Sequence, residues 1–369
     1  MKYKLGEICE IVSGSTPKTS VPEYWDGDVK WITPAELNDD SYIINDSVRK
    51  ITELGVKKTG LSPFPAGTVI LSSRAPIGKV AIAGCEMYCN QGFKNLVCSE
   101  LINNRYLFWF LKGNTEYLNS LGRGATFKEI SKQIVSAIEI NVPDIQAQEE
   151  AVQILERVSN IIQLRKQELQ KLDDFIKARF VEMFGNEKKL MTMNEVCAII
   201  TDGTHQPPKF SDAGIPFIFV SNITGDKVTY DAEKFIDQDT YDVLIKRTPI
   251  EIGDILLSTV GSYGHPAVVK TDKRFLFQRH IAYLKPKKEL VDSDYLHGAI
   301  LSPDAQRQIE EGVKGIAQKT LNLSEIKKMK IPVPSLDRQK EFAVFVLQVD
   351  KSKCDTSNIT SATQYQLAS

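Results

Sequence analysis

Cysteine and histidine are the residues of this sequence whose side chains could hold a metal ion. Three of the six cysteines follow the spacing Cys85-x3-Cys89-x8-Cys98, which is loosely similar to the spacing of zinc ligands. Cys9 and Cys197 instead lie in alternating apolar segments, which favours buried positions in a core. The four histidines form neither a His-x3-His pair nor a combined cysteine and histidine set. We therefore expect plain thiols and no metal site.

Enzymatic chemistry would need motifs that this sequence lacks. A DNA base methyltransferase needs a glycine-rich cofactor loop and an Asn/Asp-Pro-Pro-aromatic motif, whereas residues 141–144 read Asn-Val-Pro-Asp. Residues 14–19, Gly-Ser-Thr-Pro-Lys-Thr, lack the glycine spacing and the Gly-Lys pair of a phosphate loop, which favours a turn. No Gly-x-Ser-x-Gly elbow occurs, and Asp39 and Asp40 lie in a polar loop where solvated carboxylates are common. The sequence therefore predicts no catalytic residues.

The overall composition is that of an ordinary globular protein. The chain has 369 residues, 42% of them hydrophobic and 25% charged, which suggests two or three domains. The formal net charge of −1 excludes a uniformly basic nucleic-acid binder but allows basic residues to gather on one face. No segment approaches the ~18 apolar residues of a membrane span, and no signal peptide is recognisable at the start. We therefore expect a cytoplasmic protein without membrane contact.

An internal duplication is the most informative feature. Five segments of the first half return in the same order in the second half, at an offset that drifts between 186 and 191 residues. The matched pairs are 5–13 with 193–201, 67–73 with 253–259, Gln91 with Gln278, 106–107 with 295–296, and 140–150 with 331–341. A drifting offset is expected where loop lengths differ and the framework is kept. The sequence therefore predicts two copies of one domain, residues 1–143 and 186–334.

Each copy has the pattern of a mixed α+β domain. Segments 68–72, 80–83, 215–220 and 255–259 are short, rich in Val, Ile and Phe, and bounded by glycine or proline, as strands are. Residues 106–118 and 294–312 have helical apolar spacing.

A long helix is predicted between the two copies. Asp144 is a suitable N-cap, and no glycine or proline follows until Gly185, so residues 144–185 would form a helix of about 60 Å. Apolar side chains recur every seventh residue, which favours a coiled-coil arm over an ordinary core helix. This stripe consists of Leu155, Ile162, Leu169, Ile176 and Met183.

A partner helix begins after the second copy. It places Phe342, Phe345, Val346 and Val349 on one face, but from Cys354 the sequence becomes polar and β-branched. We therefore expect a second helical spacer, residues 335–369, that is short or degraded. Part of the stripe would then need cover from another protein, because exposed apolar side chains are unfavourable.

This layout resembles the specificity subunits of type I restriction–modification systems over the whole chain. The resemblance rests on the domain opening at 5–8, the central strand at 67–72, the Gly-x-Thr segment at 124–126, the spacer entrances at 140–148 and 331–339, and the spacer end at 180–185. The second copy matches the Gly-x-Thr segment only partly, at 315–318. The resemblance implies an α+β fold with two similar target-recognition domains in pseudo-twofold arrangement, joined by long coiled-coil helical spacers.

The resemblance also implies a function without chemistry in this chain. Each domain would read one half of a split, asymmetric site in double-stranded DNA, since two non-identical domains can meet one duplex twice. The helical stripe would dock two modification (methyltransferase) subunits, and restriction (translocase/nuclease) subunits would join them. S-adenosylmethionine, ATP and Mg²⁺ would bind to those partners, leaving this chain without a cofactor.

Candidate DNA contacts are polar side chains on loops of both copies, because such groups reach phosphates and base edges. In the first copy they are Thr16, Lys18, Arg74, Lys79, Arg123, Thr126 and Lys128. In the second copy they are Thr204, His205, Lys209, Ser262, Tyr263, Arg279, Lys314 and Lys319.

Two alternatives stay open at this point. One is an enzyme, either a fused methyltransferase–specificity protein or a nuclease, which a methyl-transfer assay on the purified chain would identify. The other is a silent or recombined specificity cassette, suggested by the altered tail, which would fail to co-purify with a modification subunit.

Overall fold

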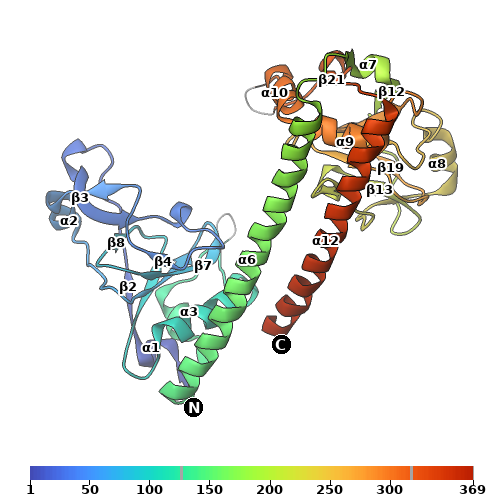
Figure 1. Ribbon diagram of the computed structural model, residues 1–369. Helices are drawn as coiled ribbons and strands as arrows, with labels where there is room; N and C mark the ends of the chain where they lie inside the picture. The colour runs from blue at the N-terminus through green and yellow to red at the C-terminus, as the bar shows by residue number, and fades with distance from the viewer. Residues whose placement is uncertain (125–127, 316–318, 369) are drawn as a thin grey trace. The chain divides into compact units, whose positions relative to one another are not determined.

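The computed structural model describes residues 1–124, 128–315 and 319–368, with side chains except at positions 224 and 354–368. It forms two compact units (Figure 1). The first unit contains residues 1–163 together with the end of the chain from 362, and the second contains residues 164–361. Among the described residues, no helix combines the length and the apolarity needed to cross a bilayer.

A five-stranded sheet is the framework of the first unit. Its strands pair in the order β2-β9-β6-β7-β4, and all pairs are antiparallel except β4 with β7. Their bounds are Cys9–Ser13 for β2, Lys94–Cys98 for β9, Val69–Ser73 for β6, Ile77–Ala83 for β7 and Ile43–Ile44 for β4. A smaller sheet has the order β5-β3-β8, with bounds Lys50–Ile51, Trp25–Ile32 and Tyr88–Cys89.

The central strand β6 is buried on both faces, which explains its unbroken apolar run. Val69 and Leu71 pack in a core with Leu107 and Phe108, while Ile70 packs on the opposite face with Phe64. Successive strand residues point to opposite faces, so each face needs its own apolar cover. The helices of this unit are α1 Leu5–Ile8, α2 Glu53–Thr59, α3 Asn104–Gly113, α4 Thr115–Ser120 and α5 Lys132–Ser136.

The second unit repeats this arrangement. Its main sheet has the order β12-β20-β17-β18, with bounds Cys197–Asp202, Ile281–Pro286, Ile255–Ser258 and Pro266–Val268. A smaller sheet has the order β16-β13-β19, with bounds Phe235–Ile236, Ile215–Ile218 and Leu276–Phe277, and β14 Ile223–Thr224 pairs with β15 Lys227–Val228. The helices are α7 Met193–Val196, α8 Gln238–Leu244, α9 Ser293–Leu301, α10 Pro303–Gly312 and α11 Leu323–Lys328.

Strand pairings confirm the predicted duplication and the α+β class. The order β2-β9-β6-β7 corresponds to β12-β20-β17-β18, and each small sheet contains one parallel pair, β3 with β8 and β13 with β19. Each unit is also closed by a pair of terminal strands. They are β1 Lys2–Lys4 with β10 Glu139–Asn141, and β11 Leu190–Thr192 with β21 Lys330–Pro332. The pseudo-twofold relation between the two copies stays a prediction.

One residue match in the duplication is wrong by a single position. The amide of Asn90 donates to the carbonyl of Ile32, and the amide of Gln278 makes the corresponding bond to Ile218. Gln278 is therefore equivalent to Asn90, and Arg279 is the residue equivalent to Gln91. Identical residue types one position apart misled the comparison, because the loops before them differ in length.

The long helix predicted for residues 144–185 is confirmed as α6, Ile145–Phe184, which has 40 residues. The second spacer, predicted to be short or degraded over residues 335–369, forms one helix, α12, of 33 residues from Leu336 to Ala368. It is shorter than α6 but continuous. The polar, β-branched residues after Cys354 do not end the helix. Each costs at most about 0.7 kcal/mol relative to alanine, and no glycine or proline lies among them.

Within the second unit, α6 and α12 run antiparallel (Figure 1). The Lys353 ammonium lies 2.6 Å from Asp173, the rings of Phe345 and Phe175 are 5.1 Å apart, and Arg338 near the start of α12 lies 3.6 Å from Glu187. From pair to pair, the residue numbers rise along α12 while they fall toward the start of α6, as expected for antiparallel helices. The predicted pairing of the arm with a second helix is therefore present over this part.

The stripe of five apolar residues, spaced seven residues apart, is half-buried along its length. Ile176 and Met183 pack against the main core of the second unit, so these two contacts are made within the chain. A different row of α6 is more exposed, with Ile154 at 61%, Ile161 at 46% and Leu164 at 64%. Whether the stripe forms a subunit interface stays a prediction, and the exposed row is a further candidate for it.

A buried glutamine joins each long helix to the α+β domain that precedes it. The Gln148 amide group donates to the carbonyls of Leu101 and Pro143, at 3.1 and 2.9 Å, and its carbonyl accepts from the Asn103 amide at 2.8 Å. Gln339 makes the same three bonds in the second unit, to Leu290, Pro334 and Asp292. Both glutamines are fully buried. This explains why Gln148 and Gln339 stand at equivalent positions in the two copies.

Replacing Gln148 or Gln339 by leucine should therefore destabilise the corresponding unit by about 2–4 kcal/mol. The change leaves three backbone groups without partners in a site that water cannot reach, and each such group costs about 1–3 kcal/mol before relaxation. Urea unfolding of the full chain would measure the loss. Gln146→Leu is the matched control, since Gln146 is exposed on the same helix and its side chain bonds to Glu150 on the helix surface. Equal stability of Q148L and Q146L would contradict the assignment.

Candidate nucleic-acid interface

In the first unit, a short hairpin brings three of the predicted contacts together. Arg123 and Glu129 exchange two backbone hydrogen bonds of 3.0 Å, and the Ile130 amide bonds to the carbonyl of Ser73 at the end of β6. Arg74 follows Ser73, so its guanidinium lies 3.8 Å from the Glu129 carboxylate. Arg123 and the neighbouring Lys128 are exposed. Thr126, a further predicted contact, lies outside the described residues.

Glu129 organises this cluster and was missed by the sequence analysis. Besides Arg74 it contacts the ammonium of Lys94, at 3.3 Å, and Lys94 is largely buried. One carboxylate thus faces two cations. Arg74 is half-exposed, and an exposed ion pair is worth little in water, so this guanidinium can exchange its carboxylate for a phosphate at small cost.

The equivalent hairpin of the second unit gathers the corresponding residues. Lys314 and Thr320 exchange backbone hydrogen bonds of 3.0 and 2.9 Å, and the Leu321 amide bonds to the Thr259 carbonyl. Ser262 and Tyr263 lie in the turn after Thr259. The Lys319 ammonium lies 3.0 Å from Glu310 and 3.3 Å from the Tyr263 hydroxyl. Four predicted residues of this copy therefore lie around one hairpin.

In the second unit, the contacts between Lys319, Glu310 and Tyr263 favour the charged forms of the lysine and the glutamate. The hydrogen bond to Glu310 raises the pKa of Lys319 above its usual value, so this lysine stays protonated at neutral pH. The Tyr263 hydroxyl, followed by Lys319, lowers the pKa of Glu310. The acid comes from α10 here, whereas Glu129 belongs to the hairpin itself. The two units thus use different carboxylates, and the basic residues that these carboxylates contact are not at equivalent positions.

In both units, the loop that follows the first strand of the main sheet, β2 or β12, is held by the same backbone hydrogen bond. The Ser15 amide donates to the Cys89 carbonyl at 3.1 Å, and the Thr204 amide donates to the Phe277 carbonyl at 3.0 Å. The preceding residues must be glycine, because a Cβ on Gly14 or Gly203 would lie 1.9 or 2.3 Å from the same carbonyl oxygens. Thr16 and His205 therefore occupy equivalent positions, and Thr16 donates to Gln91 at 2.5 Å. Lys18 and Lys209 are exposed further along each loop.

In the second unit, this loop borders a pocket with a volume of about 700 Å³. The Asp202 carboxylate at the end of β12 bonds to Arg247 and lies 2.8 Å from His205 Nε2. Arg247 follows α8, and sequence reasoning missed it because no local pattern indicates its contact with a strand 45 residues earlier. Loop residues Thr204, His205 and Lys209 line the pocket together with Arg247 and Thr248.

Two residues predicted to contact DNA, Lys79 and Arg279, make side-chain contacts within the protein. The Lys79 ammonium donates to the carbonyls of Pro34 and Leu37, so it holds the segment after β3. Arg279 is exposed, and its Nε lies 3.3 Å from His280 Nε2. Both assignments to DNA contact stay predictions, and Lys79 has the weaker structural support.

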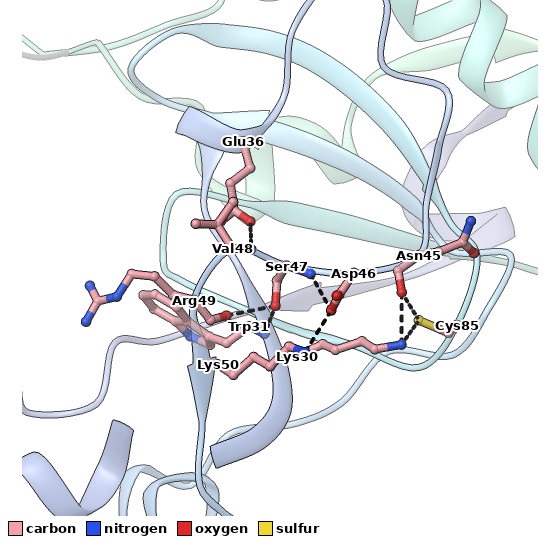
Figure 2. A network of polar contacts seen from close by, with 10 residues as sticks. All are labelled: Lys30, Trp31, Glu36, Asn45, Asp46, Ser47, Val48, Arg49, Lys50 and Cys85. Atoms are coloured by element: carbon pink, nitrogen blue, oxygen red, sulfur yellow. Dashed lines mark hydrogen bonds and ion pairs between the residues drawn. The ribbon is translucent and has the colours of Figure 1, made fainter. Parts of the chain in front are cut away.

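The cysteines of the zinc-like spacing have three different environments. Cys85 contacts the Lys30 ammonium at 3.2 Å, next to the Asn45 carbonyl (Figure 2). Cys89 is buried in the core under β6, and Cys98 packs against the opposite core. In the parts of the chain that the structure describes, no three His, Cys, Asp or Glu side chains are grouped as metal ligands.

The contacts around Cys85 belong to a network that fixes residues 45–50 on the small sheet (Figure 2). The Trp31 amide donates to the Ser47 hydroxyl at 2.9 Å, and that hydroxyl donates to the Arg49 carbonyl at 2.7 Å. The Glu36 carboxylate accepts from the Val48 amide at 2.7 Å. These bonds position a segment that also carries the basic residues Arg49 and Lys50, beside Lys30 of β3, with Lys50 paired to Asp46 at 3.4 Å.

Comparison with known proteins finds the same family in both halves of the chain. Residues 1–174 and 186–362 each match the family described as "Type I restriction modification DNA specificity domain". The chain is 34% identical over 246 residues to the type I restriction enzyme MjaIX specificity subunit of Methanocaldococcus jannaschii. That alignment covers 60% of this chain and 57% of the relative, so the chain spans little more than half of that relative's length.

Solved structures share the fold at low sequence identity. A chain from a study of complex assembly and conformational transition of the type I R-M system matches with a TM-score of 0.58 and 17% identity, covering 100% of this chain and 95% of that one. The S subunit of a type I restriction–modification system from M. genitalium matches with a TM-score of 0.51 and 13% identity, covering 100% and 93%.

Proposed function

The chain belongs to the family of type I restriction–modification DNA specificity domains, and on this premise we propose that it is the DNA-reading specificity subunit of such a complex. Each unit would read one half of a split, asymmetric site. The observation that carries the proposal is that equivalent hairpins present basic residues at equivalent positions, Arg123 and Lys128 in one unit and Lys314 and Lys319 in the other. Exposed basic side chains suit phosphate contacts and guanine readout.

We further propose that α6 and α12 dock two modification subunits, and that restriction subunits join this assembly in the cytoplasm. The exposed apolar residues of α6, Ile154 and Ile161, support a docking role, because such side chains are better covered by a partner. S-adenosylmethionine, ATP and Mg²⁺ would be bound by those partners. The chain itself would contribute recognition without catalysis.

The length of α12 bears on the alternative of a silent cassette. That alternative rests on an early break of the second helix, whereas α12 continues to Ala368. Co-purification with a modification subunit would separate an active subunit from a silent one.

The purified chain alone should transfer no methyl group to DNA. Addition of a modification subunit and S-adenosylmethionine should produce adenine methylation at a split sequence motif, because the chemistry lies on the partner. Incorporation of labelled methyl groups, followed by mapping of N6-methyladenine, measures both outcomes. Methyl transfer by the chain without a partner would overturn the non-catalytic assignment. Methylation at a continuous motif would contradict the two-reader proposal.

A further inference from the structure

Two cysteines of the first unit face each other across neighbouring strands. Cys9 of β2 and Cys98 of β9 are direct partners in the antiparallel register. The Ser99 amide donates to the Ile8 carbonyl at 3.0 Å, while the Cys9 amide donates to Leu5. Cys9 and Cys98 are therefore a non-hydrogen-bonded pair, the type in which opposite Cα atoms approach most closely, to about 4.5 Å.

The two thiols are in contact at the edge of the core. A hydrogen bond between the Cys9 and Cys98 side chains, followed by burial, raises the pKa of Cys9. Cys9 is 7% exposed, whereas Cys98 is only partly buried. Solvent and small oxidants therefore reach Cys98 first, with the Cys9 sulfur already beside it.

We propose that Cys9 and Cys98 are a reversible oxidation site, which a peroxide converts to a disulfide within the first recognition domain. Disulfides span Cα separations of about 4.4–6.8 Å, so this pair needs no movement of the backbone. The Cys98 thiol loses its proton and the sulfur attacks the peroxide, forming an S–O bond and breaking the O–O bond. The proton goes to the leaving hydroxide, so a sulfenic acid and water result. The Cys9 sulfur then attacks that sulfur, the S–S bond forms and the S–O bond breaks, and the departing hydroxide takes the Cys9 thiol proton to give a second water. Two thiols are oxidised for each peroxide reduced.

The second recognition domain has no such site at the equivalent position. Cys197 of β12 corresponds to Cys9, but its partner across the strands is Pro286 of β20. An oxidant that stabilises one domain should therefore leave the other unchanged. The duplication thus supplies a control within the same chain.

The disulfide would join the two strands that lead to a candidate DNA-contacting region. β2 continues into the loop with Thr16, and Gln91, which accepts its hydrogen bond, precedes β9. A bond between residues 9 and 98 encloses residues 10–97 and so restricts the unfolded chain strongly. We expect it to stabilise the first unit without blocking either loop, since the cross-link lies at the opposite ends of both strands.

The test is peroxide treatment of the full reduced chain, followed by peptide mapping under non-reducing conditions. A peptide pair joined through Cys9 and Cys98 should appear and should vanish after addition of dithiothreitol. Thermal unfolding of the first unit, followed by hydrogen exchange in β2 and β9, should shift upward by about 5 °C or more.

Three variants make the result decisive. Cys98→Ser and Cys9→Ala should abolish both the cross-link and the thermal shift, whereas Cys197→Ser should retain both. Because the peptide map uses the natural chain, poor folding of a variant does not remove the test. Absence of the 9–98 peptide pair, or cross-links that form equally well in C98S, would overturn the proposal.

Discussion

Replacing Phe342 by alanine is expected to lower the free energy of unfolding of the second unit by about 3–5 kcal/mol. The Phe342 ring is fully buried where α12, α6 and α9 meet. Its centroid lies 5.4 Å from Phe180 and 5.8 Å from Phe184 of α6, and 6.3 Å from Tyr295 of α9. Removing the ring leaves a cavity between three helices that cannot close without moving all of them.

Gly298 of α9 packs directly against the Phe342 ring. A Cβ on Gly298 would lie 2.6 Å from a ring carbon of Phe342, so α9 approaches α12 closely only because this residue is glycine. Urea unfolding of the full chain measures the effect. Val344→Ala is the matched control, because Val344 lies on the same helix and is 54% exposed. A loss below about 1 kcal/mol in F342A would show that the helices do not depend on this contact.

Periodicity and repetition could be interpreted correctly from the sequence because both survive changes in loop length. The α6 helix follows from an N-cap, a heptad and the absence of glycine and proline over 40 residues. The duplication follows from motifs that specify strands and their ends, such as residues 67–73 and 253–259. These features depend on residues close together in the chain.

The errors arose where local pattern and tertiary structure diverge. Gln278 was matched to Gln91 by residue type, but hydrogen bonding makes Arg279 the equivalent residue. The polar tail after Cys354 was expected to leave the second spacer short or degraded, yet α12 continues to Ala368, because propensity alone is a weak determinant of helix ends. Glu129, Glu310 and Arg247 organise the candidate interface through contacts with distant segments. No spacing rule within one segment could have identified them.

The largest functional effect is expected from exchanging residues 1–143 for a different recognition domain of the same family. The methylated half-site read by the first domain should change, while the half-site read by the second should persist. Discrimination of about 1–3 kcal/mol for each base pair implies a change in preference of two or more orders of magnitude over one half-site. Mapping of N6-methyladenine in cells with the matching modification subunit measures both half-sites together.

The structure explains why such a chimera should fold. Strand β1 pairs with β10, and the terminal amine of Met1 lies 2.9 Å from the Val142 carbonyl, so the exchanged segment closes on itself. The three side-chain hydrogen bonds of Gln148 go to backbone groups of the domain, which any domain with the same loop would supply.

The side-chain contacts of Glu156 with Tyr42 and Arg105 would be lost in this chimera, and these are partly exposed contacts of small energy. The reciprocal exchange of residues 186–334 is the matched control and should change the other half-site alone. If either exchange altered both half-sites, the two domains would not read DNA independently, and the proposed function would need a shared recognition surface.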